Sequence, residues 1–112
     1  MELWRIIAGA AANGTAVIAA TTYLDEAERA GWVDLLHDGH QLASGTPQEI
    51  VDGIPGTVSD EAAPQDRATA WRHGRRWHQW HPDGDASAGG PHRPSLEDAA
   101  IVRELLANGS AA

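Results

Sequence analysis

The sequence has 112 residues, 42% of them apolar, and a formal net charge of −8, which fits one small domain. It contains no cysteine, which excludes a disulfide scaffold and cysteine-ligated metal sites. All eight basic residues are arginine, so a phosphate-binding loop ending in Gly-Lys-Ser/Thr is absent from these residues.

No stretch of the sequence is both long and apolar enough to span a membrane, and no signal peptide is visible at its start. The acidic net charge gives the chain no general attraction to nucleic acid. Residues 67–81, which hold four arginines and no acid, are the one basic segment. We therefore expect a cytoplasmic chain that neither inserts into a membrane nor binds nucleic acid.

The first thirty residues predict an α/β arrangement. Residues 2–12 carry apolar side chains at three- and four-residue spacing and are followed by Asn-Gly, which predicts a helix and its end. Residues 16–21 are a nearly all-apolar run of strand length. A strand without polar alternation is usually buried on both faces, as in a parallel sheet under helices. A short acidic helix over residues 24–30 follows.

A hairpin is predicted next. Residues 32–37 and 41–43 read as strands, and Asp38-Gly39 between them favours a tight two-residue turn.

Two later helices carry start signals. Thr46 can cap a helix over residues 47–53, and Glu49 completes a capping box. Ser95 can cap a last helix over residues 96–107 in the same way.

The segment between those two helices has a different composition. Residues 59–68 are small and polar, which is typical of a linker or mobile loop. Residues 71–80 alternate crudely between aromatic and polar side chains, and Gly74 can mark a turn between two short strands. Residues 82–95 are rich in glycine and proline and predict another loop.

The order of these signals in residues 2–56 resembles the C-terminal part of an ABC-transporter ATPase domain. Residues 21–28, TTYLDEAE, are similar to the family's switch loop, commonly Thr-His-Tyr followed by Met/Leu-Asp-Glu-Ala-Glu, at every place but one. The Asp-Gly turn and the GTPQE helix start at residues 45–49 follow in the family's order. Residues 95–98, SLED, are similar to the Leu-Glu-Asp motif near the end of ATPase subunits that serve drug and polymer exporters.

The resemblance implies an α/β fragment of a P-loop NTPase domain, with a buried strand, a hairpin, flanking helices and a C-terminal helix. Residues 1–56 would be the C-terminal part of the ATPase domain, 57–94 a variable loop or small β extension, and 95–112 a C-terminal helix and tail. The chain would be a segment of an ATP-binding subunit of an ABC exporter, peripheral to the inner membrane. Its partners would be the rest of the ATPase domain and a membrane permease.

The family's Walker A, signature and Walker B motifs are absent from these residues. ATP and Mg²⁺ are therefore expected as cofactors of the full-length parent only, and the chain alone is expected to be inactive.

Thr22 stands where the resemblance places the switch histidine, whose imidazole reaches the terminal phosphate and helps to hold the attacking water. Phosphoryl transfer depends on such positioning and charge stabilisation. A threonine hydroxyl is shorter than an imidazole, so Thr22 indicates a degenerate catalytic position. The alternative interpretation is a polar residue that ends a strand.

Other candidate groups have simpler interpretations. Two of Asp25, Glu26 and Glu28 could form a carboxylate pair for acid–base catalysis, but acids in a first helical turn are more often solvated and favoured by the helix dipole.

Four histidines are candidate metal ligands: His73, His78, His81 and His92. Gly74 and the loop after Pro82 argue against the helix that His78 and His81 would need, so no metal site is expected.

The Trp71–Trp80 segment supports an alternative function. Its three tryptophans and three arginines could form a stacking surface for single-stranded nucleic acid. A stand-alone, non-enzymatic binding module that acts through this segment is the alternative function. The tryptophans could equally be core residues covered by arginine stems. A sheet fragment would also leave an unpaired edge, so self-association of the isolated chain is expected.

Overall fold

The structure is a computed structural model of the chain and describes residues 2–84 and 90–109. The helices and strands in chain order are α1 (Glu2–Ala12), α2 (Leu24–Ala27), β1 (Val33–His37), β2 (His40–Gly45), α3 (Pro47–Asp52), β3 (Thr57–Glu61), the 3-10 turn η1 (Arg67–Thr69), β4 (Ala70–His73), β5 (Arg76–His81), β6 (Gly90–His92) and α4 (Leu96–Ala107). None of the helices in this part of the chain is long and apolar enough to cross a membrane.

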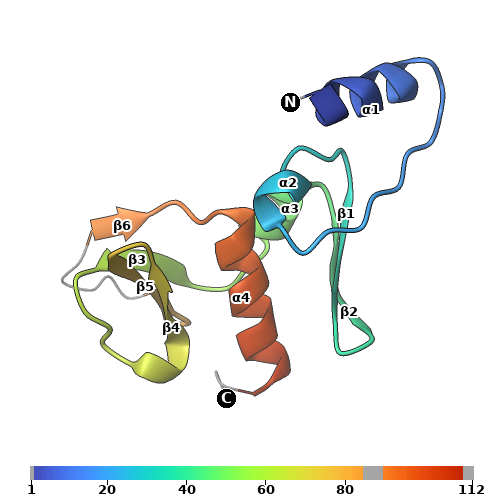
Figure 1. The fold of residues 1–112 in the computed structure, drawn as a ribbon. Helices are drawn as coiled ribbons and strands as arrows, with labels where there is room; N and C mark the ends of the chain where they lie inside the picture. Colours follow the sequence, from blue (N-terminus) through green and yellow to red (C-terminus); the bar gives the residue numbers. More distant parts are fainter. Residues whose placement is uncertain (1, 85–89, 110–112) are drawn as a thin grey trace.

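The α4 helix lies between two antiparallel sheets (Figure 1). On one side stand the β1–β2 hairpin and the short helices α2 and α3, and on the other stands a four-stranded sheet in the order β4-β5-β3-β6. The expected mixture of helices and strands with a C-terminal helix is confirmed.

The predicted hairpin is confirmed. Strands β1 and β2 pair in antiparallel register from Val33 opposite Gly45 to His37 opposite His40. The turn residues Asp38 and Gly39 have φ angles of 50° and 76°, the left-handed values that a type I′ turn requires at both central positions.

The predicted helix starts are also confirmed. Thr46 accepts a hydrogen bond from the Glu49 backbone N–H, and the Glu49 carboxylate accepts one from Thr46 in return. At α4 the same reciprocal pair joins Ser95 and Asp98. Each capping box satisfies two backbone donors that the first turn of a helix leaves without partners.

The four-stranded sheet corrects two predicted loops. Residues 59–61 belong to β3 rather than to a linker, and residues 90–92 form β6 rather than a loop. Both strands are short and carry polar or turn-forming residues, so local composition alone does not reveal them. The predicted turn at Gly74 is confirmed, because it joins β4 to β5.

Apolar side chains from both sheets meet on α4. Toward the hairpin, the buried residues of the first core cluster are Val33, Leu35, Ile50, Leu96, Ala99 and Ala100. Toward the other sheet, the buried residues of the second are Val58, Trp80 and Val102. Ile54, just after α3, packs against both clusters. A single helix therefore holds both halves of the core.

The predicted buried strand over residues 16–21 is wrong. These residues form no helix or strand in the structure and are exposed, with Ile18 97% exposed. Figure 1 shows α1 apart from α4 and the four-stranded sheet, with a long extended segment that joins α1 to α2. A parallel strand needs hydrogen-bonding neighbours and covering helices, and none of the described residues supplies them here.

Candidate functional site

Residues 21–28, the segment similar to a switch loop, lead from the extended N-terminal segment into α2. The Thr21 hydroxyl donates a hydrogen bond to Glu26 Oε1 at 2.9 Å and accepts one from the Tyr23 backbone N–H at 2.9 Å. Thr22 lies at an exposed bend two residues before the start of α2. The loop is therefore shaped by its first threonine, and the second presents its side chain to solvent.

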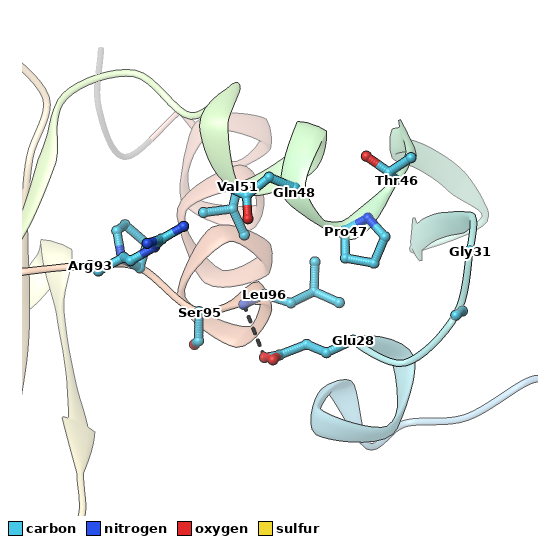
Figure 2. A pocket seen from close by; sticks show the side chains of 11 residues that line it. Glu28, Gly31, Thr46, Pro47, Gln48, Val51, Arg93, Ser95 and Leu96 are labelled. Atoms are coloured by element: carbon cyan, nitrogen blue, oxygen red, sulfur yellow. Dashed lines mark hydrogen bonds between the residues drawn. The ribbon is translucent and has the colours of Figure 1, made fainter. Parts of the chain in front are cut away.

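Glu28 links this segment to the C-terminal helix. Its Oε1 accepts a hydrogen bond from the Leu96 backbone N–H at 3.3 Å, which satisfies one of the open donors in the first turn of α4 (Figure 2). Glu26 and Glu28 thus serve different partners, and Asp25 is exposed. The structure does not gather these acids into one proton-transfer site.

A pocket of about 530 Å³ lies where the end of α2, the start of α3 and the start of α4 meet. Figure 2 shows Glu28 and Leu96 joined by a hydrogen bond, with Thr46 and Pro47 on one side of them and Arg93 on the other. Three of the segments that carry the family resemblance, TTYLDEAE, GTPQE and SLED, therefore meet at one pocket although they are separated in the sequence.

A second group of polar side chains gathers where α4 covers the four-stranded sheet. Asp98 is its centre: Oδ1 accepts hydrogen bonds from Trp71 Nε1 at 2.9 Å and His78 Nδ1 at 2.7 Å. Oδ2 accepts from His92 Nε2 at 3.1 Å and from the Ser95 backbone N–H at 3.0 Å. We call His78, His92 and Asp98 the histidine–aspartate cluster.

Sheet register explains why these side chains converge. His78 on β5 lies opposite Trp71 on β4 and opposite Asp60 on β3, so all three share a face of the sheet. His92 on β6 lies opposite Val58, which points to the same face as Trp80. Asp98, in the first turn of α4, lies against the face of the sheet that carries His78 and His92.

The Asp98 side chain is 1% exposed and remains ionised. Burial on its own raises the pKa of this carboxyl, but hydrogen bonds from Ser95, His78 and Trp71 outweigh burial and hold the pKa below its ordinary value of 3.8. An ionised carboxylate only accepts hydrogen bonds, so the facing nitrogens of His78 and His92 are the donors.

The four histidines tested as metal ligands divide between two faces of the four-stranded sheet. His73 stacks on His78 with ring centroids 4.4 Å apart, and His92 follows at 4.1 Å from His78. His81 lies on the opposite face, with its Nε2 2.8 Å from the Ser59 hydroxyl. His78 and His81 therefore do not lie side by side, as they would on one face of a helix. His78 instead lies beside His92 and Asp98.

The tryptophans of the Trp71–Trp80 segment have separate surroundings. Trp80 is 1% exposed in the core, and its indole donates to the Pro55 carbonyl at 2.8 Å. Trp71 is half-buried and binds Asp98. Trp77 has the Arg67 and Arg72 guanidinium groups over its ring at 5.7 and 5.4 Å. A binding role for this segment stays a prediction.

Comparison with known proteins gives a partial similarity. The chain is 34% identical over 55 residues to the probable multidrug ABC transporter ATP-binding protein YbhF of Escherichia coli (strain K12), and the same values hold for the protein of that name from Shigella flexneri. The similarity covers 49% of this chain and 10% of each relative, so the matched part spans about a tenth of the relatives' length. No family model and no solved structure matches the chain.

This similarity supports a relation to ABC-transporter ATP-binding proteins at the level of the family. At this level it agrees with the resemblance drawn from the sequence.

Proposed function

We propose that this chain is the C-terminal segment of an ATP-binding subunit of an ABC exporter. The observation that carries the proposal is the 34% identity over 55 residues to a probable multidrug ABC transporter ATP-binding protein. In the complete subunit, ATP and Mg²⁺ would be bound by upstream Walker and signature motifs. The subunit would act with a membrane permease at the cytoplasmic side of the inner membrane.

The exposed apolar surface of the N-terminal part supports this context. Leu3 and Ile6 on α1 are 62% and 67% exposed, and Ile18 is 97% exposed. Burying such side chains is favourable by about 1.5–3 kcal/mol each. The rest of an ATPase domain would cover them, and residues 16–21 would then gain neighbouring strands that the described residues do not supply.

Thr22 would face the terminal phosphate of the nucleotide in that complete domain. Its hydroxyl is too short to make the contact that a switch histidine makes, so the proposed site hydrolyses ATP slowly. The neighbouring Thr21–Glu26 hydrogen bond would hold the conformation of the loop whether position 22 is threonine or histidine.

A chimera tests the proposal. The C-terminal segment of the YbhF ATPase domain is replaced by this chain, and ATP binding and phosphate release are measured with Mg²⁺. We expect the chimera to bind ATP, and the isolated chain not to bind it in a calorimetric titration. A folded chimera that fails to bind ATP would contradict the assignment.

The role of Thr22 is tested in the same chimera. Thr22→His should raise turnover on the order of a hundredfold, because electrostatic contacts to the reacting phosphate typically contribute about 2–4 kcal/mol of barrier. Thr15→His is the matched control, because Thr15 is exposed outside the loop and its replacement should leave turnover unchanged. Equal turnover of the Thr22→His variant and the parent chimera would reduce Thr22 to a polar residue at a bend.

A further inference from the structure

We propose that His78, His92 and Asp98 together bind one divalent transition-metal ion of the zinc type. This inference is independent of the proposed ATPase relation, because it rests on the four-stranded sheet and α4 alone.

The three side chains have the spacing of a ligand set. One ligand atom from each residue lies within 4.8 Å of those of the other two. His78 Nδ1 is 2.7 Å from Asp98 Oδ1, and His92 Nε2 is 3.1 Å from Asp98 Oδ2. Zinc bonds of 2.0–2.2 Å at tetrahedral angles place neighbouring ligand atoms about 3.3 Å apart. The His92–Asp98 separation is already close to this value, and the His78–Asp98 separation is about 0.6 Å shorter.

The surrounding structure holds the ligands in place. The two histidines come from β5 and β6, which flank β3 on either side, and the aspartate comes from α4 above them. Trp71 and Ser95 hydrogen-bond the Asp98 carboxylate and fix its orientation. Such outer partners are a regular part of metal sites, because they orient the ligands before the metal arrives.

Charge and donor type favour a zinc-type cation. Asp98 is a buried carboxylate, and a buried charge needs an opposite charge or a metal ion beside it. Imidazole nitrogens suit Zn²⁺ and its neighbours in the first transition row, whereas Mg²⁺ and Ca²⁺ prefer oxygen ligands. Three protein ligands would leave a fourth position for water or another ligand.

Metal titration of the tag-free, metal-stripped chain tests the proposal. We expect calorimetry to show one Zn²⁺ per chain, and thermal unfolding to shift upward by about 10 °C at a hundredfold excess of Zn²⁺ over the dissociation constant. Mg²⁺ at the same concentration should give no shift. A folded chain that binds no Zn²⁺ would overturn the proposal.

Two histidine variants locate the ion. His92→Gln removes a ligand that is 29% exposed, so the fold should persist while zinc affinity falls at least tenfold. His40→Gln is the matched control, because His40 is an exposed histidine on β2. The zinc affinity of this variant should equal that of the unchanged chain. Equal affinities in the two variants would place the bound zinc elsewhere and refute the site.

An independent measurement covers the case in which His92→Gln unfolds the chain. X-ray absorption at the zinc edge of the unchanged chain should report two imidazoles and oxygen in the first shell. A shell containing a different number of imidazoles would contradict the assignment.

Discussion

Residues 2–23 and the remainder of the described chain contain similar apolar side chains with opposite outcomes. In the first region Ile18 is 97% exposed, whereas in the second Ile50 is 2% exposed. The difference lies in the neighbours: Ile50 packs among residues of β1 and α4, and the described residues offer Ile18 no such surface. An apolar pattern thus identifies side chains that can be buried, and the rest of the fold determines whether they are.

The largest effect expected from this comparison comes from making the same substitution in each region. Ile50→Ala should lower the free energy of unfolding by about 3 kcal/mol, because it removes buried methylenes and leaves a cavity between α3 and α4. Ile18→Ala should change it by less than about 0.5 kcal/mol, because the side chain is already in water. Urea unfolding of both variants measures the difference, and equal losses would show that residues 16–21 are packed in solution.

Helix capping gives a second, smaller contrast. Thr46→Ala should cost about 1 kcal/mol, because the Glu49 N–H loses the hydroxyl that lies 3.1 Å from it. Thr46→Ser should retain most of that stability. Thr15→Ala, in the exposed segment, is the control and should be neutral. A Thr46→Ala variant as stable as the unchanged chain in urea would show that the capping box contributes little.

The Asp60–Arg76 pair on the four-stranded sheet predicts a modest pH effect. The hydrogen bond from Arg76 lowers the pKa of Asp60 below its ordinary value of 3.8, against the opposing effect of burial. A lowered folded-state pKa contributes stability that is present above pH 3.8 and is lost as the pH falls through the folded value.

The measurement is the thermal midpoint between about pH 5 and pH 2. Asp60→Asn should make the thermal midpoint depend less strongly on pH in this range. Arg76→Gln should reduce the pH dependence of the midpoint by the same amount. If the two losses are simply additive in the double variant, the pair does not act as a unit.

The smallest expected effect is that of removing residues 1–20. Because residues 16–20 are exposed and neither core cluster includes a residue of α1, the free energy of unfolding should change by less than about 0.5 kcal/mol. Size-exclusion chromatography of the same variant tests the predicted self-association, which should decrease when these exposed apolar side chains are gone. A large loss of stability would mean that α1 docks on the core.

Local signals in the sequence predicted those parts of the fold that neighbouring residues determine. The Asp38-Gly39 turn, the capping box at Thr46 and the helix cap at Ser95 depend on residues within a few positions of one another, and all three are confirmed. The strand predicted over residues 16–21 depends on hydrogen-bonding neighbours that residues 2–84 and 90–109 do not supply. The prediction therefore failed where burial requires distant partners.

The histidine–aspartate cluster was missed for the same reason. Asp98 follows Ser95 at capping-box spacing, and nothing in that local pattern reveals that Trp71 and His78 also donate to it. Period-two alternation in β5, which places His78 and Trp80 on one face, was the signal that could have suggested a buried histidine. Thr22, by contrast, lies in an exposed bend, and its catalytic role stays a prediction.

The position of α4 at the end of the described chain has a consequence for folding during synthesis. Its first turn is bonded to Glu28 across 68 residues, and both core clusters are completed by its side chains. The hairpin and the four-stranded sheet therefore lack their common partner until the last helix leaves the ribosome. Until then both sheets expose the faces that α4 will cover, and folding of the two halves becomes cooperative only after synthesis of residues 96–107.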